Sequence, residues 1–172
     1  MEETADRQER IDPLSFYLDK SNPGPWRAVG ALTTADAADA EAAGLDPRLI
    51  ELVNLRVSQI NGCAYCLDVH TRRAVARGET AQRLGLLAAW KDAGVFDETE
   101  KVALCLAEAV TRPEAVEDRD AAQLLAHRRL TAQQYAAVQW LAIAMNTTNR
   151  ISILSHHPVR RAPERTGEGR SA

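Results

Sequence analysis

The sequence predicts an all-α protein, and two observations support that fold class. The chain is 45% hydrophobic and rich in Ala and Leu, with only 5% aromatic residues, a composition that favours helices built from small side chains. Residue pairs with the spacing of helix capping boxes recur, at Asp97 with Glu100 and at Thr131 with Gln134. At 172 residues, the chain fits a single domain that is large enough to bury a core.

Residues 1–30 are expected to form a short N-terminal helix and a docking loop. Apolar residues occur between positions 11 and 18, and they are followed by a segment with two prolines that should not continue a helix, Ser21-Asn22-Pro23-Gly24-Pro25-Trp26. Thr33 or Thr34 should then cap an alanine-rich helix that stops near Gly44. The main helical domain is placed at residues 31–157.

A helical hairpin is predicted next. Pro47 suits the first position of a helix that should run to about Ile60, where Asn61-Gly62 breaks the pattern. A second helix is expected from about Cys63 to Arg77, ending at Gly78 as a left-handed stop. The two cysteines of the C-x-x-C motif therefore open the second helix of an antiparallel pair.

Further helices are expected after the hairpin. The first is capped by Thr80 and contains Leu84, Leu86, Leu87 and Trp90, and the next starts at Asp97 and runs through Val110. Pro113 precedes a helix from Glu114 to about Leu130, and a long apolar helix covers Tyr135 to Leu154. The Arg-, Gly- and Pro-rich residues 158–172 are expected to be a disordered tail.

Charge and hydropathy argue against several classes of protein. The formal net charge is -3 and the pI is about 5.8, which offers no basic field for nucleic acid. No apolar stretch approaches the roughly 20 residues of a membrane span, and the charged start lacks the apolar region of a signal peptide. We therefore expect a cytoplasmic protein that binds neither nucleic acid nor a membrane.

The segment Gly62-Cys63-Ala64-Tyr65-Cys66 is the most informative part of the chain. His70 follows four residues after Cys66, and Glu51 precedes Cys63 by twelve residues. In a reducing compartment, a C-x-x-C pair indicates a catalytic dithiol or half of a metal site. Structural zinc needs a second pair of ligands, which Cys105 alone and the adjacent histidines near the chain end do not supply. Redox chemistry without a metal is the favoured interpretation.

Helical spacing brings the chemical groups together. On an ideal helix one face, roughly 80° wide, carries five of them: Cys63, Cys66, His70, Arg73 and Arg77. An antiparallel preceding helix places Glu51 within roughly 3 Å of the height of His70 along the axis. We therefore expect a proton relay in the order Glu51, His70, Cys66, Cys63.

Two effects bear on which cysteine attacks. Cys63, at the helix start, gains roughly 0.3–1 kcal/mol of thiolate stabilisation from the helix dipole when it is exposed. Proton removal by a neighbouring base raises the reaction rate roughly 10²–10⁴-fold, which favours Cys66. We assign Cys66 as the attacking thiolate and Cys63 as the resolving thiol. Other roles stay open: Glu51 as a solvated carboxylate, Tyr65 as a gate or as an aromatic anchor, and Arg73 as a site-lining or a surface residue.

The segment from Glu51 to His70 closely resembles the alkylhydroperoxidase AhpD-like core of the carboxymuconolactone decarboxylase superfamily. A second resemblance is the Asn-x-x-Asn-Arg pattern at Asn146, Asn149 and Arg150, and together these cover roughly residues 45–155. The chain departs from the pattern in two places. Peroxidase members often carry a histidine at the position of Tyr65, and relatives commonly have an aromatic residue at that of Thr148.

The resemblance implies an all-helical homo-oligomer, a dimer, trimer or hexamer, that reduces small hydroperoxides. Cys63 and Cys66 would cycle through a disulfide with Glu51 and His70 as relay residues, and an external dithiol or thiol protein would act as reductant. No metal, haem or flavin is implied. The alternatives are a general thiol-disulfide reductase and a non-catalytic redox sensor or oligomeric scaffold. The decarboxylase branch does not rely on a C-x-x-C pair, so the two thiols argue against the lactone reaction.

Overall fold

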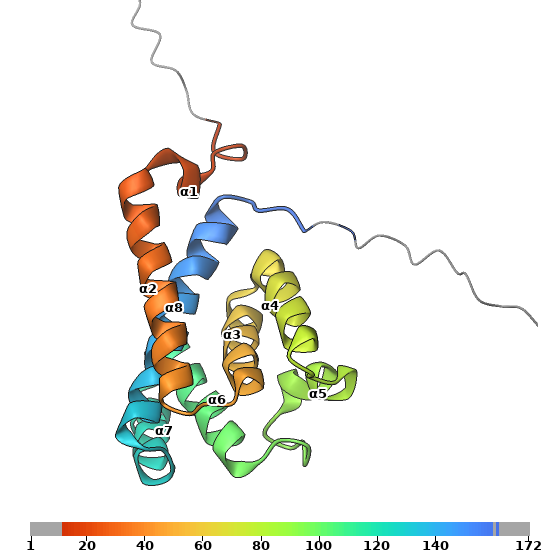
Figure 1. The fold of residues 1–172 in the computed structure, drawn as a ribbon, viewed down its shortest axis with the longest axis vertical. Helices are drawn as coiled ribbons and strands as arrows, with labels where there is room; N and C mark the ends of the chain where they lie inside the picture. The colour runs from red at the N-terminus through yellow and green to blue at the C-terminus, as the bar shows by residue number, and fades with distance from the viewer. Residues whose placement is uncertain (1–11, 160, 162–172) are drawn as a thin grey trace, which may run out of the picture.

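The computed structural model describes residues 12–159 and 161, and every regular element in that part of the chain is a helix (Figure 1). The elements are α1 (Leu18–Ser21), α2 (Pro23–Ala42), α3 (Pro47–Asn61), α4 (Ala64–Ala76), α5 (Ala81–Leu86), the 3₁₀-helix η1 (Leu87–Ala89), α6 (Glu98–Thr111), α7 (Val116–Arg129) and α8 (Ala132–Leu154). The all-α prediction is confirmed. Both predicted capping boxes are present, at the starts of α6 and α8.

Helix α3 lies at the centre of the fold. It packs against α4, α6 and α8, while α8 also packs along α2 (Figure 1). A main core forms where α2, α3, α6 and α8 meet, and it includes both cysteines of the C-x-x-C motif. A smaller core lies under α4, α5 and η1 and is built from Leu52, Leu55, Ala74, Leu87, Trp90, Phe96 and Leu104. No helix among the described residues has the length and apolar character to cross a membrane.

Local sequence signals produce the hairpin of α3 and α4. The Asp46 side chain caps α3 by accepting from the Arg48 amide, and Pro47 occupies the first turn, where its missing N–H is not needed. Gly62 ends α3 in the left-handed region at φ 69°, a conformation that costs glycine little. Cys63 then caps α4 through its sulfur, so the turn places both thiols at the helix start, as expected.

The asparagines of α8 fix the end of α3. Asn61 Nδ2 donates to Asn146 Oδ1 and to Asn149 Oδ1, each at 2.9 Å, and Asn149 Nδ2 donates to Ser58 Oγ at 3.1 Å. Asn149 and Ser58 are fully buried, so these bonds satisfy amides that would otherwise be costly to desolvate. The network holds the residue immediately before the Gly62-Cys63 turn.

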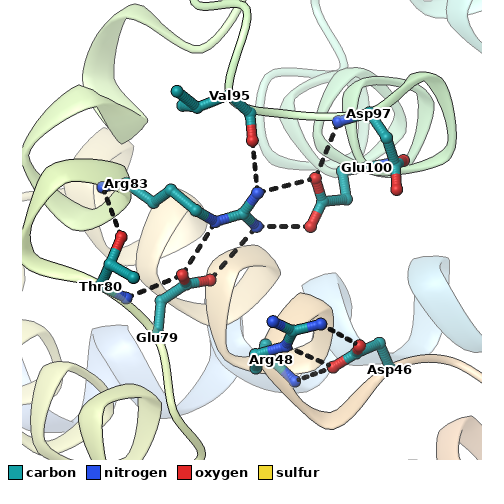
Figure 2. Close-up of polar contacts among 8 residues, drawn as sticks. All are labelled: Asp46, Arg48, Glu79, Thr80, Arg83, Val95, Asp97 and Glu100. Carbon is teal, nitrogen blue, oxygen red and sulfur yellow. Dashed lines mark hydrogen bonds and ion pairs between the residues drawn. The ribbon is translucent and has the colours of Figure 1, made fainter.

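A second polar cluster holds the turn after α4 against the start of α6 (Figure 2). Arg83 pairs with Glu79 and with Glu100, and it also donates to the carbonyl of Val95. The Glu79 side chain is 1% exposed, so its charge depends on this arginine. The same figure shows the Asp46 cap at the start of α3.

The expected loop at 21–26 and the helix start at Thr33 or Thr34 are wrong, because α2 runs without interruption from Pro23 to Ala42. Both prolines fall in the first turn of α2, where backbone amides have no partner within the helix. The two threonine hydroxyls donate to the Gly30 carbonyl at 3.0 and 2.9 Å instead of capping a helix.

Two further boundaries differ from expectation. The short N-terminal helix begins at Leu18 rather than earlier, and residues 1–11 lie outside the described part. The helix after Thr80 ends at Leu86 and tightens into η1, which turns Trp90 into the smaller core, where its indole N–H donates to Glu108 at 2.7 Å. Of the tail expected at 158–172, only residues 158, 159 and 161 are described.

Candidate active site at the thiol pair

A cavity of about 350 Å³ lies beside the start of α4. The candidate reactive side chains Cys66, His70 and Glu51 line this cavity. Two arginines of α4, Arg73 and Arg77, also line it. The remaining wall mixes polar side chains with apolar ones, and the apolar ones include Trp26, Ile50, Leu141, Ala144 and Met145. Cys66 lines this cavity and Cys63 does not, so a small molecule in the cavity meets Cys66.

The two thiols are reduced and in contact. The Cys63 thiol donates to Cys66 Sγ at 2.7 Å, and Cys63 Sγ accepts the Cys66 backbone N–H at 3.4 Å. Cys63 is 1% exposed, and its burial, followed by the hydrogen bond to Cys66, raises its pKa. Cys63 therefore holds its proton more tightly than an ordinary thiol and donates it in the hydrogen bond to Cys66 Sγ.

Glu51 and His70 form a buried pair between α3 and α4. Oε2 of Glu51 lies 2.7 Å from Nδ1 of His70, and Oε1 lies 3.4 Å from Nη1 of Arg77. Glu51 is only 2% exposed, so the alternative of a solvated helix carboxylate is wrong. The predicted hairpin spacing did bring the carboxylate to the imidazole.

His70 and Cys66 both line the cavity, but no direct hydrogen bond joins them among the described residues. Tyr65 and Arg73 also line it, although both residues are partly open to solvent. Arg77 bridges Glu51 and the carbonyl of Pro47, which it reaches at 3.0 Å. The structure therefore places every residue proposed for the site, apart from Cys63, on the cavity wall.

Asp36 of α2 was not predicted and lies on the opposite wall of the cavity. It is 7% exposed, and burial raises its pKa from 3.8 to about 6. In the sequence it sits among alanines and resembles the neighbouring Asp39, so no spacing or motif distinguishes it. Only the packing of α2 on α8 shows which of these acids faces the cavity.

A second group missed by sequence reasoning comes from both ends of the described chain. His157, just after α8, lines the cavity together with Asp19 of α1 and Ser152 of α8. Its ring stacks on Tyr17 at a centroid distance of 5.8 Å and meets Tyr65 edge-on at 5.1 Å. These contacts hold His157 in place on the cavity wall.

Comparison with known proteins gives sequence relatives first. The family model of the carboxymuconolactone decarboxylase family matches residues 27–109. The Bacillus subtilis protein YdfG, which is uncharacterised, is 38% identical over 103 residues, covering 60% of this chain and 70% of YdfG. The uncharacterised Escherichia coli protein YnjA is 32% identical over 84 residues, covering 48% of this chain and 46% of YnjA.

A solved structure shares the fold. ATU0492 from Agrobacterium tumefaciens, a protein of unknown function provisionally assigned as the antioxidant defence protein AhpD, superposes with a TM-score of 0.75. The two chains are 30% identical, and the match covers 86% of this chain and 99% of ATU0492. The match extends well beyond the 27–109 segment.

Proposed function

Because the chain belongs to the carboxymuconolactone decarboxylase family and has an AhpD-like core, we propose that it is a thiol-dependent peroxidase acting on organic hydroperoxides. One observation carries the proposal: Cys66 lines a cavity, with a second thiol at 2.7 Å on one side and the Glu51–His70 pair sharing the same wall. The apolar side chains of the cavity wall, among them Trp26, Leu141 and Met145, suit the organic part of such a peroxide.

The first step is attack of the Cys66 thiolate on the distal peroxide oxygen. The O–O bond breaks, Cys66 becomes a sulfenic acid, and the departing alkoxide takes up a proton to leave as an alcohol. The Glu51 carboxylate accepts from Nδ1 of His70, so Nε2 is the ring nitrogen free to take the Cys66 proton or pass it on. The absence of a direct bond to Cys66 means that a water or the substrate would bridge the two.

The second step converts the Cys66 sulfenic acid into a disulfide with Cys63. Cys63 attacks the Cys66 sulfenic acid, the S–O bond breaks, and water leaves as the disulfide forms. An external dithiol or thiol protein then reduces the disulfide and is itself oxidised to a disulfide. The reductant is a separate molecule, and we propose that the enzyme works in the cytoplasm as a homo-oligomer.

The test is steady-state consumption of cumene hydroperoxide and hydrogen peroxide with a dithiol reductant. Cys66→Ser should abolish turnover, and Cys63→Ser should stop after one turnover with a sulfenic acid on Cys66, which a dimedone label and mass spectrometry locate. Cys105→Ser is the matched control, because Cys105 is a free, half-buried thiol that packs against the smaller core. It should retain wild-type turnover.

Two results would overturn the proposal. One is a wild type that consumes neither peroxide but exchanges readily with small disulfides, which would make it a thiol-disulfide reductase. Labelling of Cys63 instead of Cys66 in the single variants would reverse the roles of the two thiols.

A further inference from the structure

Two buried polar side chains on the cavity wall have no side-chain partner among the described residues. Asp36 of α2 is 7% exposed and Asn54 of α3 is 8% exposed, and both line the cavity that also meets Cys66. Every fully enclosed side-chain nitrogen or oxygen in the described part of the chain has a hydrogen-bond partner. The polar ends of Asp36 and Asn54 therefore reach open space, and the cavity that they line provides it.

The threonine hydroxyls of the same wall do not supply the missing donor. Thr33 donates its hydroxyl proton to the Gly30 carbonyl at 3.0 Å, and Thr148 donates to the Ala144 carbonyl at 3.2 Å. Because a hydroxyl has a single proton to donate, these bonds leave the Asp36 carboxylate without a donor from either threonine. A buried polar group without a partner is costly, so a ligand that supplies donors is favoured here.

The charged groups of the cavity wall are mostly paired with one another: Glu51 with His70 and Arg77, and Asp19 with His157. Asp36 and Arg73 have no ion pair within the described ranges. Arg73 is exposed, so water screens its charge, whereas the charge of buried Asp36 acts on a ligand through a less polar medium. The cavity therefore favours a positive group beside Asp36.

The Asp36 carboxyl is ionised at neutral pH despite its burial. Burial raises its pKa to about 6, and neither the amide of Ala37, which lowers the pKa, nor the negative charge of Asp39, which raises it, outweighs that effect. Near pH 7.5 the group is thus a carboxylate that lacks a cation. A ligand that brings a cation removes the cost of leaving this charge unpaired.

We propose that Asp36, with Asn54 as a second acceptor, binds an ammonium group, so that the hydroperoxides reduced at Cys66 carry a protonated amine on their organic part. An ammonium has three N–H donors, which the two carboxylate oxygens and the Asn54 side-chain oxygen can accept. Asp36 lies on the wall opposite Cys66, so the peroxide end of such a molecule would face the thiol. This inference rests on the proposed function for its chemistry and adds the class of substrate.

The experiment compares small disulfides that differ in charge. Cystamine carries two ammonium groups, hydroxyethyl disulfide is neutral, and dithiodipropionate carries two carboxylates. The Cys66 thiolate attacks one sulfur, the S–S bond breaks, and half of the reagent leaves as a thiolate before Cys63 displaces the other half. Acid-quenched samples analysed by mass spectrometry give the rate at which reduced protein is lost.

The wild type should react faster with cystamine than with the other two disulfides, after correction for their rates with a free thiol. Asp36→Asn should lower the ratio of the cystamine rate to the hydroxyethyl disulfide rate by roughly tenfold. Asp36→Glu keeps the charge and should retain most of the preference, and Asn54→Leu should lower the ratio by roughly threefold. Asp39→Asn removes an equal charge from an exposed position of α2 outside the cavity and is the matched control, with an unaltered ratio.

The disulfide assay keeps this inference separate from the proposed function. A protein that consumes no peroxide but loses its preference for cystamine in Asp36→Asn would retain the ammonium subsite and lose the peroxidase assignment. If peroxides are consumed, an aminomethyl derivative of cumene hydroperoxide should have a KM roughly tenfold below that of cumene hydroperoxide itself. Asp36→Asn should remove this difference in KM and leave kcat unchanged.

Four results would overturn the ammonium subsite. One is an equal ratio of rates in wild type and Asp36→Asn. A second is the same fall in Asp39→Asn, which would reflect the overall charge of the protein. A third is an equal slowing of all three disulfides in Asp36→Asn, since the residue would then act on Cys66 rather than on the ligand. The fourth is a wild type that prefers dithiodipropionate, which would make Arg73 the dominant charge.

Discussion

Glu51 on α3 and His70 on α4 approach to 2.7 Å between Oε2 and Nδ1 in a buried contact across the hairpin. The carboxylate also meets Arg77 two turns further along α4. Because one acid contacts two positions of α4, it fixes both the tautomer of the imidazole and the alignment of the hairpin. The thiols at the start of α4 are presented to the cavity by this alignment.

Glu51→Gln tests the charge of this contact, because the amide oxygen can still accept from the imidazole. Without the negative charge the imidazolium is no longer stabilised, so the reaction of Cys66 with peroxide or with a small disulfide should slow by about 10- to 100-fold. Rapid-mixing rates for the first step measure this. Glu98→Gln alters an exposed acid at the start of α6 and should change nothing. Equal rates for Glu51→Gln and wild type would remove Glu51 from the proton path.

Asp36 predicts a dependence of stability on pH. Its folded-state pKa of about 6 exceeds the ordinary value of 3.8, so the folded protein keeps a proton that the unfolded chain has lost. The free energy of unfolding should therefore fall as pH rises from about 4 to about 6. Asp36→Asn should remove this fall and stabilise the protein near pH 7.5 by on the order of 1–2 kcal/mol.

Urea denaturation at several pH values measures the effect of Asp36→Asn. Below about pH 4 the variant and the wild type should have the same stability, because the carboxyl is then protonated in both states. Glu41→Gln, at the exposed end of α2, is the control. A variant that is less stable than wild type near pH 7.5 would show that the ionised carboxylate is favourably bound.

Asn149→Ala should lower the free energy of unfolding by about 1–3 kcal/mol. The substitution leaves buried Ser58 and the Asn61 amide each short of a partner beside the turn that carries the thiols. Chemical denaturation gives the loss. Arg150→Ala, an exposed neighbour, should stay within about 0.5 kcal/mol of wild type. A loss of that smaller size for Asn149→Ala would mean that water replaces the lost bonds.

Arg83→Met should be the most destabilising of these substitutions, by about 3–5 kcal/mol, because it leaves the buried Glu79 carboxylate without its cation. Arg72→Met removes the arginine of an exposed pair with Asp68 and should cost no more than about 1 kcal/mol. Thermal or urea denaturation of both variants compares the two. Similar losses of stability in the two variants would show that the structure rearranges and relieves the unpaired charge of Glu79.

The hairpin and its thiol pair could be predicted because their signals are local. Gly62 and Pro47 mark the helix ends, and the spacing of Cys63, Cys66 and His70 follows helical periodicity. The height of Glu51 opposite His70 then required only that the two helices run antiparallel. No long-range contact had to be known.

The parts that sequence reasoning missed depend on contacts distant in the chain. Pro23 and Pro25 can stand in either a loop or a first helical turn, and the packing of α2 against α8 decides for the helix. His157 contacts Asp19, which lies 138 positions away in the sequence, and no periodicity in the sequence predicts this pairing. The hydrogen bond from the Leu18 amide to Ser155 Oγ, at 3.0 Å, is of the same kind.

That junction of α1 with the residues after α8 has a consequence for biosynthesis. The cavity wall formed by Asp19, Ser152 and His157 needs both ends of the described chain at once. During translation α3, α4 and their thiols emerge from the ribosome long before His157, so the thiol pair cannot be enclosed until nearly the last described residue has been added. A nascent chain therefore exposes two reactive sulfurs to cellular oxidants in the interval between the emergence of α4 and that of His157.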